Sequence, residues 1–479
     1  MMTMNRILLT LFIAHTIGLT ANGQATITPI KVTDLNPDGG SRPFAMKVGG
    51  AANDRLCFST TMDHGAQGYT FGIHSTSGTP EGTATLMLDN KKVEVSQIAA
   101  QGLFYKRHTA WAEYTFHFLP PSTAAALNVA PVLEFVPLQA PSASRVTSAL
   151  YNGNLVHPSK KDPALGYELY TMPPLPNGTT TLIKDMAPGA VSGMSHEVGS
   201  GVIGVLHNKV YFAAYTEAEG NEAWCTNGTA QGTIRRSNLP ANSSFFSSEY
   251  KVFGDRLFMS VAEAGSNEEL FAIMDSSAML TKVKEINPSP TIGSLPRELT
   301  VQGKTLYFSA DDGTKGRELW RTDGTAAGTV LVKDLNTLGG SMAHGLVAYG
   351  KLLYFFAKTV IGRSGEVLYS TDGTAVNTKA CVTLPAGTTG STPMVCNGKL
   401  FYVTRTTAAP YSSKLWRTNG TTAGTQQVWA PIVVSPDQGL NVTVPPDDAI
   451  STAPMQLMGN WLYFGADFDA KGVELWKVQ

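Results

Sequence analysis

The stretch Glu318-Leu-Trp-Arg-Thr-Asp-Gly-Thr-Ala-Ala-Gly-Thr329 recurs along the chain. Close copies stand at 222–233 (EAWCTNGTAQGT) and 414–425 (KLWRTNGTTAGT), with a shorter copy at 367–374 (VLYSTDGT). Each copy places an aromatic residue a few positions before a turn sequence that ends in Gly-Thr. Because self-similarity at a fixed period is the sequence signature of repeat architectures, this stretch decides the class of fold.

The aromatic residue of the motif measures the period. The clear anchors lie about 50 residues apart and are Tyr170, Trp224, Phe271, Trp320, Tyr369, Trp416 and Trp476. Degenerate copies near His74 and His117 extend the series toward the N-terminus. About nine units therefore fill residues 24–479 as a single domain, with an insertion at about 431–452.

Each unit is expected to contain four short strands, A to D. In the unit at 296–336, the expected strands are 296–301, 305–310, 318–322 and 329–335, separated by Gly- and Asp-rich turns. Four antiparallel strands per repeat are typical of β-propeller blades. The apolar residues of strands B and C are adjacent rather than alternating, which indicates sheets covered on both faces. An open solenoid, and a ring of eight blades with a degenerate second unit, are the alternatives.

The two ends of the chain indicate a closed ring. Residues 27–35 resemble a strand D, and residues 474–478 form a strand C with which the chain stops. The N-terminal strand can therefore pair with the last blade and leave few free strand edges.

The repeat resembles that of the ELWxxDGT-repeat family of secreted bacterial proteins. The family motif continues into a Val-Lys-Asp-Leu-Asn element, which stands here at 332–336 and in variant form at 283–287. The resemblance covers nearly the whole chain and fades between 84 and 148. It implies an exported protein, often with a C-terminal sorting domain, whereas this chain ends with its last unit. It implies no known chemistry.

The N-terminus has the pattern of a secretory signal peptide. A single positive charge precedes the short apolar run 7–19, and small residues follow, so we expect residues 1–23 to be removed near 23–25. We expect no transmembrane helix and a secreted protein, extracellular or periplasmic. Of the four cysteines, Cys381 and Cys396 suggest a local disulfide, but they fall on an outer strand and the next inner strand. Since a disulfide needs Cα atoms within about 7 Å, we expect no bond.

Composition excludes two classes of partner. Lys plus Arg number 36 and Asp plus Glu 37, so the formal net charge is −1. A nucleic-acid-binding protein or a polybasic membrane-surface protein would carry a marked positive excess. No motif for a metal, nucleotide or other cofactor is present, and we expect none.

The repeated acidic residues have a structural interpretation. Asp323 and Asp372 of the turns are replaced by Asn227, Asn419 and Ser77 in sister units, and all three residue types can cap a turn. The strand C glutamates also recur, but Lys414 replaces one of them. We expect hydrogen-bonded roles for the glutamates, which are Glu168, Glu222, Glu269, Glu318, Glu366 and Glu474.

Off-pattern aromatic residues mark a candidate binding face. The B–C and D–A loops leave one end of each blade, vary between units, and carry the extra aromatics. The candidate ligand-binding residues are Trp111, Trp429, Phe245, Phe246 and Tyr411. Because aromatic rings suit sugars and partner proteins, and loops on rigid scaffolds often carry function, we expect binding at this face. Packing of these rings under their own blades is the alternative.

The sequence therefore predicts a monomeric, non-catalytic binding protein for an extracellular glycan or protein. The alternatives are a polysaccharide hydrolase or lyase and a structural envelope component. A glycosidase would need two carboxylates about 5–10 Å apart. Its candidate acids would be Asp63, Asp311, Asp312, Asp437, Asp447 and Asp448.

Overall fold

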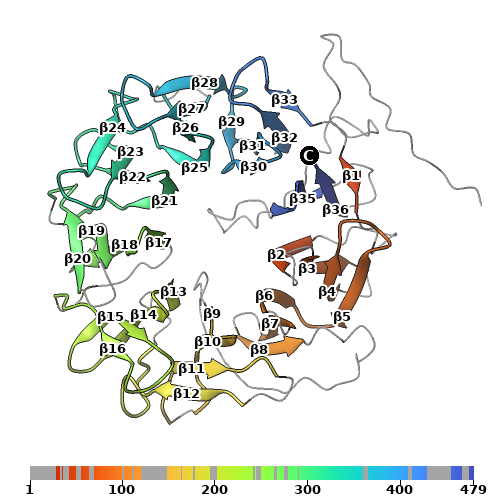
Figure 1. The fold of residues 1–479 in the computed structure, drawn as a ribbon, viewed down its shortest axis with the longest axis vertical. Coiled ribbons are helices and arrows are strands. Elements are labelled where there is room, and N and C mark those ends of the chain that lie inside the picture. The colour runs from red at the N-terminus through yellow and green to blue at the C-terminus, as the bar shows by residue number, and fades with distance from the viewer. Residues whose placement is uncertain are drawn as a thin grey trace, which may run out of the picture.

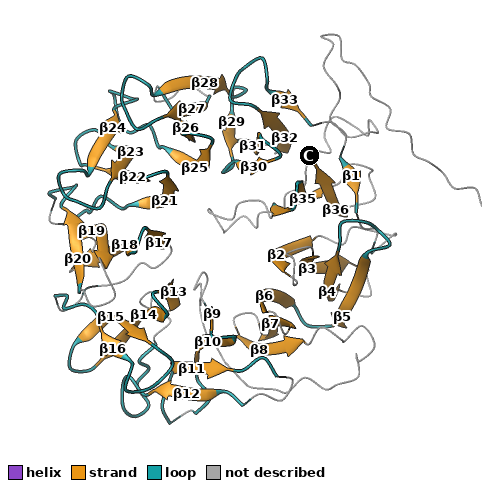
Figure 2. Ribbon diagram, viewed as in Figure 1, coloured by secondary structure: helices purple, strands orange, loops and turns teal. Residues whose placement is uncertain are grey.

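In the computed structural model the chain is an all-β ring of nine small antiparallel sheets, the blades of a β-propeller (Figure 1). Among the described residues every regular element is a strand (Figure 2). The structure describes residues 29–32, 35, 43–49, 55–63, 69–99, 102–110, 113–119, 148–162, 164–175, 179–194, 202–240, 243, 250–263, 267–273, 279–289, 291–359, 365–407, 413–428, 455–466 and 474–479.

The strands of each blade run from the central channel outward in chain order, A to D, except that the N-terminal strand β1 (Ile30–Lys31) is the outermost strand of the last blade. The innermost strands A are β2 (Pro43–Gly49), β6 (Val93–Ala99), β9 (Ala149–Tyr151), β13 (Val202–Leu206), β17 (Tyr250–Phe253), β21 (Arg297–Gln302), β25 (His344–Tyr349), β29 (Thr388–Gly390) with β30 (Met394–Cys396), and β34 (Gln456–Met458). The strands B are β3 (Arg55–Asp63), β7 (Gly102–Ala110), β10 (Asn154–Ser159), β14 (Lys209–Thr216), β18 (Arg256–Glu263), β22 (Thr305–Asp311), β26 (Leu352–Ala357), β31 (Lys399–Thr406) and β35 (Trp461–Ala466).

The outer half of each blade follows the same rule. The strands C are β4 (Tyr69–Thr76), β8 (Glu113–Leu119), β11 (Glu168–Met172), β15 (Gly220–Thr226), β19 (Asn267–Ile273), β23 (Arg317–Thr322), β27 (Val367–Thr371), β32 (Ser413–Thr418) and β36 (Glu474–Val478). The strands D are β1 (Ile30–Lys31), β5 (Thr83–Asp89), β12 (Thr181–Lys184), β16 (Ile234–Arg235), β20 (Leu280–Lys284), β24 (Val330–Lys333), β28 (Lys379–Thr383) and β33 (Gln426–Gln427).

The prediction of four strands per unit is confirmed in the unit at 296–336, where β21 to β24 match the expected strands within a few residues. The middle strands are buried along nearly their whole length: β22 is buried from Leu306 to Ala310. Apolar clusters lie between neighbouring blades; Phe258 and Leu270, for example, pack with Leu306 and Phe308 of the next blade. Stacking of the blades therefore buries both faces of each sheet, as the adjacent apolar residues predicted.

The ring closes through the N-terminal strand, as predicted. Strand β1 pairs antiparallel with β36, with Ile30 opposite Lys477 and Lys31 opposite Trp476. The amide of Val32 donates a hydrogen bond of 2.8 Å to the carbonyl of Leu475, and Val32 is fully buried. The sheet β1-β36-β35-β34 thus joins both ends of the chain, and the solenoid alternative does not apply.

The second unit is a blade of its own. Its described strands β6, β7 and β8 form a separate antiparallel sheet between the β2–β5 and β9–β12 blades. The ring therefore has nine blades, and the eight-blade alternative is wrong. In the blade of β31, the inner strand is divided into β29 and β30 on either side of residues 391–393, where Pro393 cannot donate to a ladder.

Lysine side chains link some neighbouring blades at their outer edges. Each of these lysines is the last residue of its strand D, and its ammonium group donates to a main-chain carbonyl in the following blade. The pairs are Lys184 with Thr233 at 3.2 Å, Lys284 with Thr329 at 2.7 Å, and Lys333 with Thr378 at 3.2 Å. The lysine of the repeated Val-Lys-Asp element therefore has a structural role, which is to link neighbouring blades.

All four cysteines are free, so the prediction that Cys381 and Cys396 do not bond is confirmed. Cys381 lies on outer strand β28 and Cys396 on inner strand β30 of the next blade. No helix in the described ranges is long and apolar enough to cross a membrane. The expected signal peptide at 1–23 lies outside the described residues.

Candidate functional site: the loop face and the central channel

The C–D turns are closed by their own side chains. In the turn of β23 and β24, Asp323 Oδ1 accepts hydrogen bonds from the amide and hydroxyl of Thr325, at 2.9 and 2.7 Å. Asn419 Oδ1 makes the same bonds to Thr421, at 3.1 and 2.7 Å. Because an amide oxygen and a carboxylate oxygen serve equally well, the acidic residue has a capping role here.

The strand C glutamates fasten the D–A crossovers. Glu318 is fully buried and accepts hydrogen bonds from the amide of Ser341 at 2.9 Å, its hydroxyl at 2.6 Å, and the amide of Leu335 at 3.4 Å. Burial raises the pKa of Glu318, against the lowering effect of these bonds. Equivalent bonds from crossover residues reach Glu168, Glu222, Glu269 and Glu366. The predicted hydrogen-bonded role is confirmed for these five; the side chain of Glu474 lies outside the described residues.

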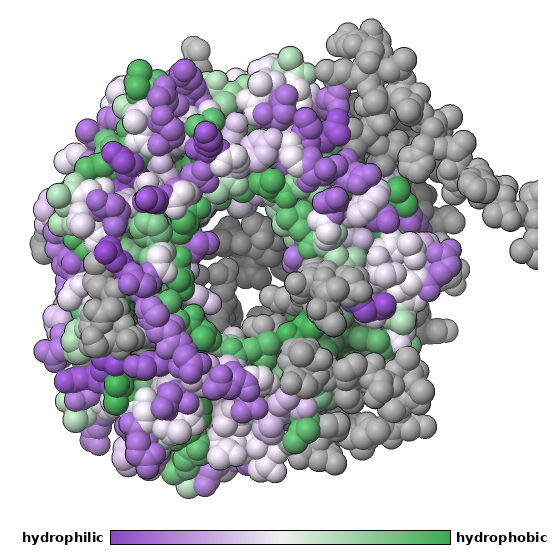
Figure 3. All heavy atoms as spheres, viewed as in Figure 1, coloured by the Kyte–Doolittle hydropathy of each residue, from purple (hydrophilic) through white to green (hydrophobic). Residues whose placement is uncertain are grey.

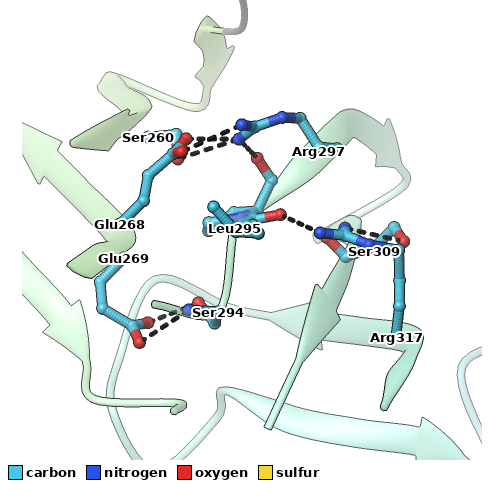
Figure 4. Close-up of polar contacts among 9 residues, drawn as sticks. Ser260, Glu268, Glu269, Ser294, Leu295, Arg297, Ser309 and Arg317 are labelled. Atoms are coloured by element: carbon cyan, nitrogen blue, oxygen red, sulfur yellow. Dashed lines mark hydrogen bonds and ion pairs between the residues drawn. The ribbon is translucent and has the colours of Figure 1, made fainter. Parts of the chain in front are cut away.

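Two adjacent glutamates in β19 illustrate how the acids are used (Figure 4). Figure 4 shows Glu268 pointing toward Ser260 and Arg297, whereas Glu269 points the other way, toward Ser294. Arg297 comes from the next blade and pairs with Glu268, with a second contact of 3.0 Å from Nη2 to Oε2. The two carboxylates therefore serve two different contacts and do not converge on a common space.

The candidate acids of a polysaccharide-cleaving enzyme are divided by the structure. Asp311 is the last residue of β22, and Asp312 begins the B–C loop that follows. Asp311 Oδ1 accepts from the amide of Gly313, and Asp312 Oδ1 accepts from the amides of Thr314 and Lys315. Both are therefore loop caps. The side chain of Asp63, and all of Asp437, Asp447 and Asp448, lie outside the described residues.

The predicted aromatic ligand-binding residues lie outside the described residues; they are Trp111, Trp429, Phe245, Phe246 and Tyr411. The predicted repeat anchors lie on strands C. Tyr170, Trp224, Phe271, Trp320, Tyr369 and Trp476 are buried, and Trp416 is half-buried. No group of three metal-ligating side chains occurs in the described part of the chain.

The inner strands carry a feature that the sequence reasoning missed, a belt of aliphatic side chains, and several of these side chains pack against the apolar clusters between blades. In every blade, the strand A residue that pairs with the repeated Leu or Val of strand B is aliphatic. The belt residues are Val48, Ile98, Leu150, Val205, Val252, Val301, Ala348, Val395 and Leu457. Their strand B partners, such as Leu257 and Leu306, are fully buried.

The belt is only partly covered. Val205 is 41% exposed and Val252 38%, and the other belt residues whose burial is described are half-buried. Figure 3 shows the ring hollow at its centre, with apolar atoms along the rim of the opening. The inner strands are also the inner edges of their sheets, and a neighbouring blade satisfies part of such an edge: the amide of Leu346 in β25 donates to Glu298 Oε2 of β21 at 3.0 Å.

Cationic residues recur at the A–B turns, and two of them, Arg55 and Arg256, donate to the C–D turn carbonyls of Gly82 and Asp323. Six A–B hairpins carry a cation at the turn or at the first residue of strand B: Arg55, Lys209, Arg256, Lys304, Lys351 and Lys399. Among the described A–B turns, one acidic residue accompanies these cations: Asp255, whose Oδ1 lies 3.9 Å from Arg256 Nε. The Gly-Lys pairs at 303–304, 350–351 and 398–399 were the sequence signal for this ring.

Hydrogen bonds hold successive A–B turns side by side. The last residue of a strand A donates to a main-chain carbonyl in the turn of the next blade. Gln302 Nε2 reaches the carbonyl of Gly350 at 3.1 Å, and Tyr349 Oη that of Gly398 at 2.6 Å. Tyr151 Oη bonds the carbonyl of Asn208 at 2.8 Å in the same way. These hydrogen bonds between blades therefore fix the positions of the turns that carry the cations.

Solved β-propeller structures are among the proteins to which this chain is similar, at low identity and low TM-score. No family model and no curated protein matches the chain. The β-propeller domain of the Trilobed protease from Pyrococcus furiosus is 9% identical over 81% of this chain and 97% of that one, with a TM-score of 0.36. An uncharacterised protein from Listeria monocytogenes is 10% identical over 83% and 98%, with a TM-score of 0.36.

A longer protein shares the likeness. Prolyl oligopeptidase B from Galerina marginata is 7% identical over 77% of this chain, which spans 55% of that protein, with a TM-score of 0.38. The fold and the blade number rest on the strand pairing within this chain.

Proposed function

We propose that the chain is a secreted, non-catalytic binding protein that recognises an extracellular glycan or protein partner through its B–C and D–A loops. The secreted location follows from the apolar run at 7–19 and from the resemblance to exported repeat proteins. The loop face follows from the distribution of the off-pattern aromatic residues.

One observation carries the proposal: the repeated carboxylates are used to hold the loops. Glu269 receives hydrogen bonds from Ile286, Asn287 and Ser294, residues at both ends of one crossover. Glu318 does the same in the next blade, and Glu366 in the blade after it accepts from the hydroxyl of Thr389 and the amide of Gly390. An acid saturated in this way is a poor general acid or base, whereas a fixed loop is a good recognition element, since ordering costs are lower on binding.

The proposal is tested with the mature chain from Gln24. Binding to a panel of polysaccharides and glycans is measured, and release of reducing sugar is followed in the same wells. We expect binding without release. Trp111→Ala and Trp429→Ala should weaken that binding at least fivefold, whereas Val376→Ala, an exposed residue of a C–D turn on the opposite face, should leave it unchanged.

Two results would count against this function. Release of reducing sugar would make the protein an enzyme and turn attention to the loop carboxylates. Binding that survives both tryptophan substitutions would remove the loop face as the site. If no glycan binds, capture of a protein partner that depends on Trp111 or Trp429 remains the expected outcome.

A further inference from the structure

The dipeptide Asn-Gly stands in two kinds of turn in the described part of the chain. It forms the A–B turns at 152–153 and 397–398, and it opens the C–D turns at 227–228 and 419–420. In Asn-Gly the glycine nitrogen can attack the side-chain carbonyl carbon of the asparagine, because the glycine has no Cβ to hinder the approach. We propose that Asn152 and Asn397 are sites of non-enzymatic deamidation, and that the C–D turns are protected from it.

The reaction balances with water as its only co-reactant. The glycine nitrogen forms a bond to Cγ of the asparagine and loses its proton, and the side-chain nitrogen leaves as ammonia. The cyclic succinimide that results then takes up a water molecule. Opening of one C–N bond of the ring gives aspartate, and opening of the other gives isoaspartate, whose main chain runs through the side-chain carbon. Either product carries a new negative charge.

The C–D turns hold both reacting groups. Asn419 Oδ1 accepts hydrogen bonds from the amide and the hydroxyl of Thr421, at 3.1 and 2.7 Å, so its carbonyl is fixed in the cap. The attacking nitrogen, that of Gly420, donates to Thr418 Oγ1 at 3.0 Å. The turn at Asn227 has all three equivalent bonds. Attack in these turns therefore requires that three hydrogen bonds break first.

The A–B turns leave both groups open. Asn152 and Asn397 are exposed, and their φ angles are 48° and 45°. In the described part of the chain, no hydrogen bond is made by either side chain or by the amides of Gly153 and Gly398. No atom lies within 4 Å of a Cβ placed on Gly398. The nitrogen and the carbonyl carbon can therefore approach each other without the loss of a hydrogen bond, and water reaches the turn.

Conversion at Asn397 alters a contact between two blades. The carbonyl of Gly398 accepts a hydrogen bond of 2.6 Å from Tyr349 Oη in the preceding blade. Isoaspartate adds a carbon atom to the main chain of this two-residue turn, so the carbonyl is displaced from Tyr349. Deamidation also places a negative charge next to Lys399, beyond the glycine. The deamidated protein therefore has a weaker link between the blades of β26 and β31.

The test is peptide mapping of the mature chain after incubation at neutral pH. Mass spectrometry gives the converted fraction at each Asn-Gly pair, and chromatography separates aspartate from isoaspartate. Asn152 and Asn397 should convert at least fivefold faster than Asn227 and Asn419. The control is the same chain in guanidinium chloride, where all four should convert at similar rates because no turn is folded.

Three results of this experiment would overturn the proposal. The first is equal conversion at the four asparagines in the folded protein. The second is faster conversion in the C–D turns than in the A–B turns. The third is a folded protein in which neither Asn152 nor Asn397 converts over a period that converts the unfolded chain.

Thr421→Val tests the protection by the cap. It removes the hydroxyl that bonds Asn419 Oδ1 and keeps a β-branched side chain at an exposed position, so the fold should be retained. The rate at Asn419 should rise at least threefold, and the rate at Asn397 in the same sample should stay unchanged. An unchanged rate at Asn419 would contradict protection by the cap.

Asn397→Gly tests the effect on the blades. Sister units have Gly303 and Gly350 at this turn position, with φ of 60° and 61°, so the variant should keep its turn. On incubation, the melting temperature of the native chain should fall more than that of the variant. Equal falls would overturn the assigned effect at Asn397. Glycan binding through Trp111 is measured separately, so failure of the proposed function would leave these results unchanged.

Discussion

Asp323 shows how one residue position can look catalytic and be structural. Its carboxylate caps its own turn through Thr325, and Asn419 makes the same bonds in a sister unit. The hydrogen bonds to Thr325 lower the pKa of Asp323, as expected of a carboxylate that accepts several donors. What the position requires is a short side chain with an acceptor oxygen.

The capping role predicts that Asp323→Asn is nearly silent. The amide oxygen of Asn can accept both bonds, so the free energy of unfolding should change by less than about 0.5 kcal/mol. Asp323→Ala removes the acceptor and should cost about 1 kcal/mol. Thermal melting of the two variants checks this. A larger effect of Asn than of Ala would contradict the cap.

Glu168 is a buried residue whose charge state affects stability near neutral pH. It is fully buried, and burial raises its pKa to about 7, more than the amides of Met186 and Gly193 lower it. A carboxyl whose pKa is higher in the folded than in the unfolded state is most favourable to folding below the unfolded value of about 4.3. That contribution is lost as the pH rises through about 7.

Glu168→Gln should therefore flatten part of the pH dependence of stability. Between pH 5 and pH 8 the native chain should lose stability relative to the variant, by at most about 3 kcal/mol. Melting temperatures of both proteins across this range make the measurement. The difference in melting temperature between the two proteins reports on Glu168 alone, because both contain the buried His74, His117 and His157. Burial lowers the pKa values of these histidines to about 4, so they affect stability below pH 6.5 in both proteins. Parallel curves would contradict the assignment.

At the scale of elements, the C–D turn also contributes to packing between blades. Gly373 has a φ of +96°, and a Cβ placed there would lie 2.4 Å from the hydroxyl of Tyr307 in the preceding blade. Gly420 meets Tyr354 and Gly78 meets Tyr463 in the same way. The glycine of the motif is therefore needed both for the turn and for the approach of the neighbouring strand B.

This double role can be separated by two substitutions. Gly398 has a φ of +66°, and no atom lies near a Cβ placed there. Gly398→Ala should therefore lower the free energy of unfolding only by the backbone strain, about 1–2 kcal/mol. Gly373→Ala adds the collision with Tyr307 and should cost clearly more. Denaturant midpoints of the two variants give the comparison. Equal losses would mean that Tyr307 moves aside without penalty.

At the scale of the whole molecule, stability depends on a strand of two residues. β1 pairs with β36, and Val32 packs with Leu56, Tyr463 and Leu475 across the junction of the first and last blades. Without β1, the outer edge of β36 would be open to pairing with other molecules.

A chain that starts at residue 37 should therefore melt at a lower temperature than one that starts at residue 24, and should aggregate at high concentration. A chain that starts at residue 29 keeps β1 and should behave like the chain from 24. Thermal melting and size-exclusion chromatography of the three chains check the prediction. Identical behaviour of the chains from 24 and 37 would show that closure contributes nothing.

The sequence by itself determined the blade and its repetition. Turns such as 323–329 depend on hydrogen bonds within a few residues, so their motif carries its own structure, as Asp323 and Thr325 show. The buried anchors followed from spacing alone, because each blade repeats the same packing. Even the closure of the ring was visible, since the two ends supply complementary strands of one blade.

Only the tertiary structure decided what meets across blades. Gln302 and Gly350 are 48 residues apart, and Tyr349 and Gly398 are 49 apart, so no local pattern pairs them. The half-exposed Val205 and Val252 were indistinguishable from ordinary core, because a valine on a strand has the same sequence pattern whether or not a neighbouring blade covers it. Exposure is a property of the closed ring, and the ring forms only when all the blades are stacked.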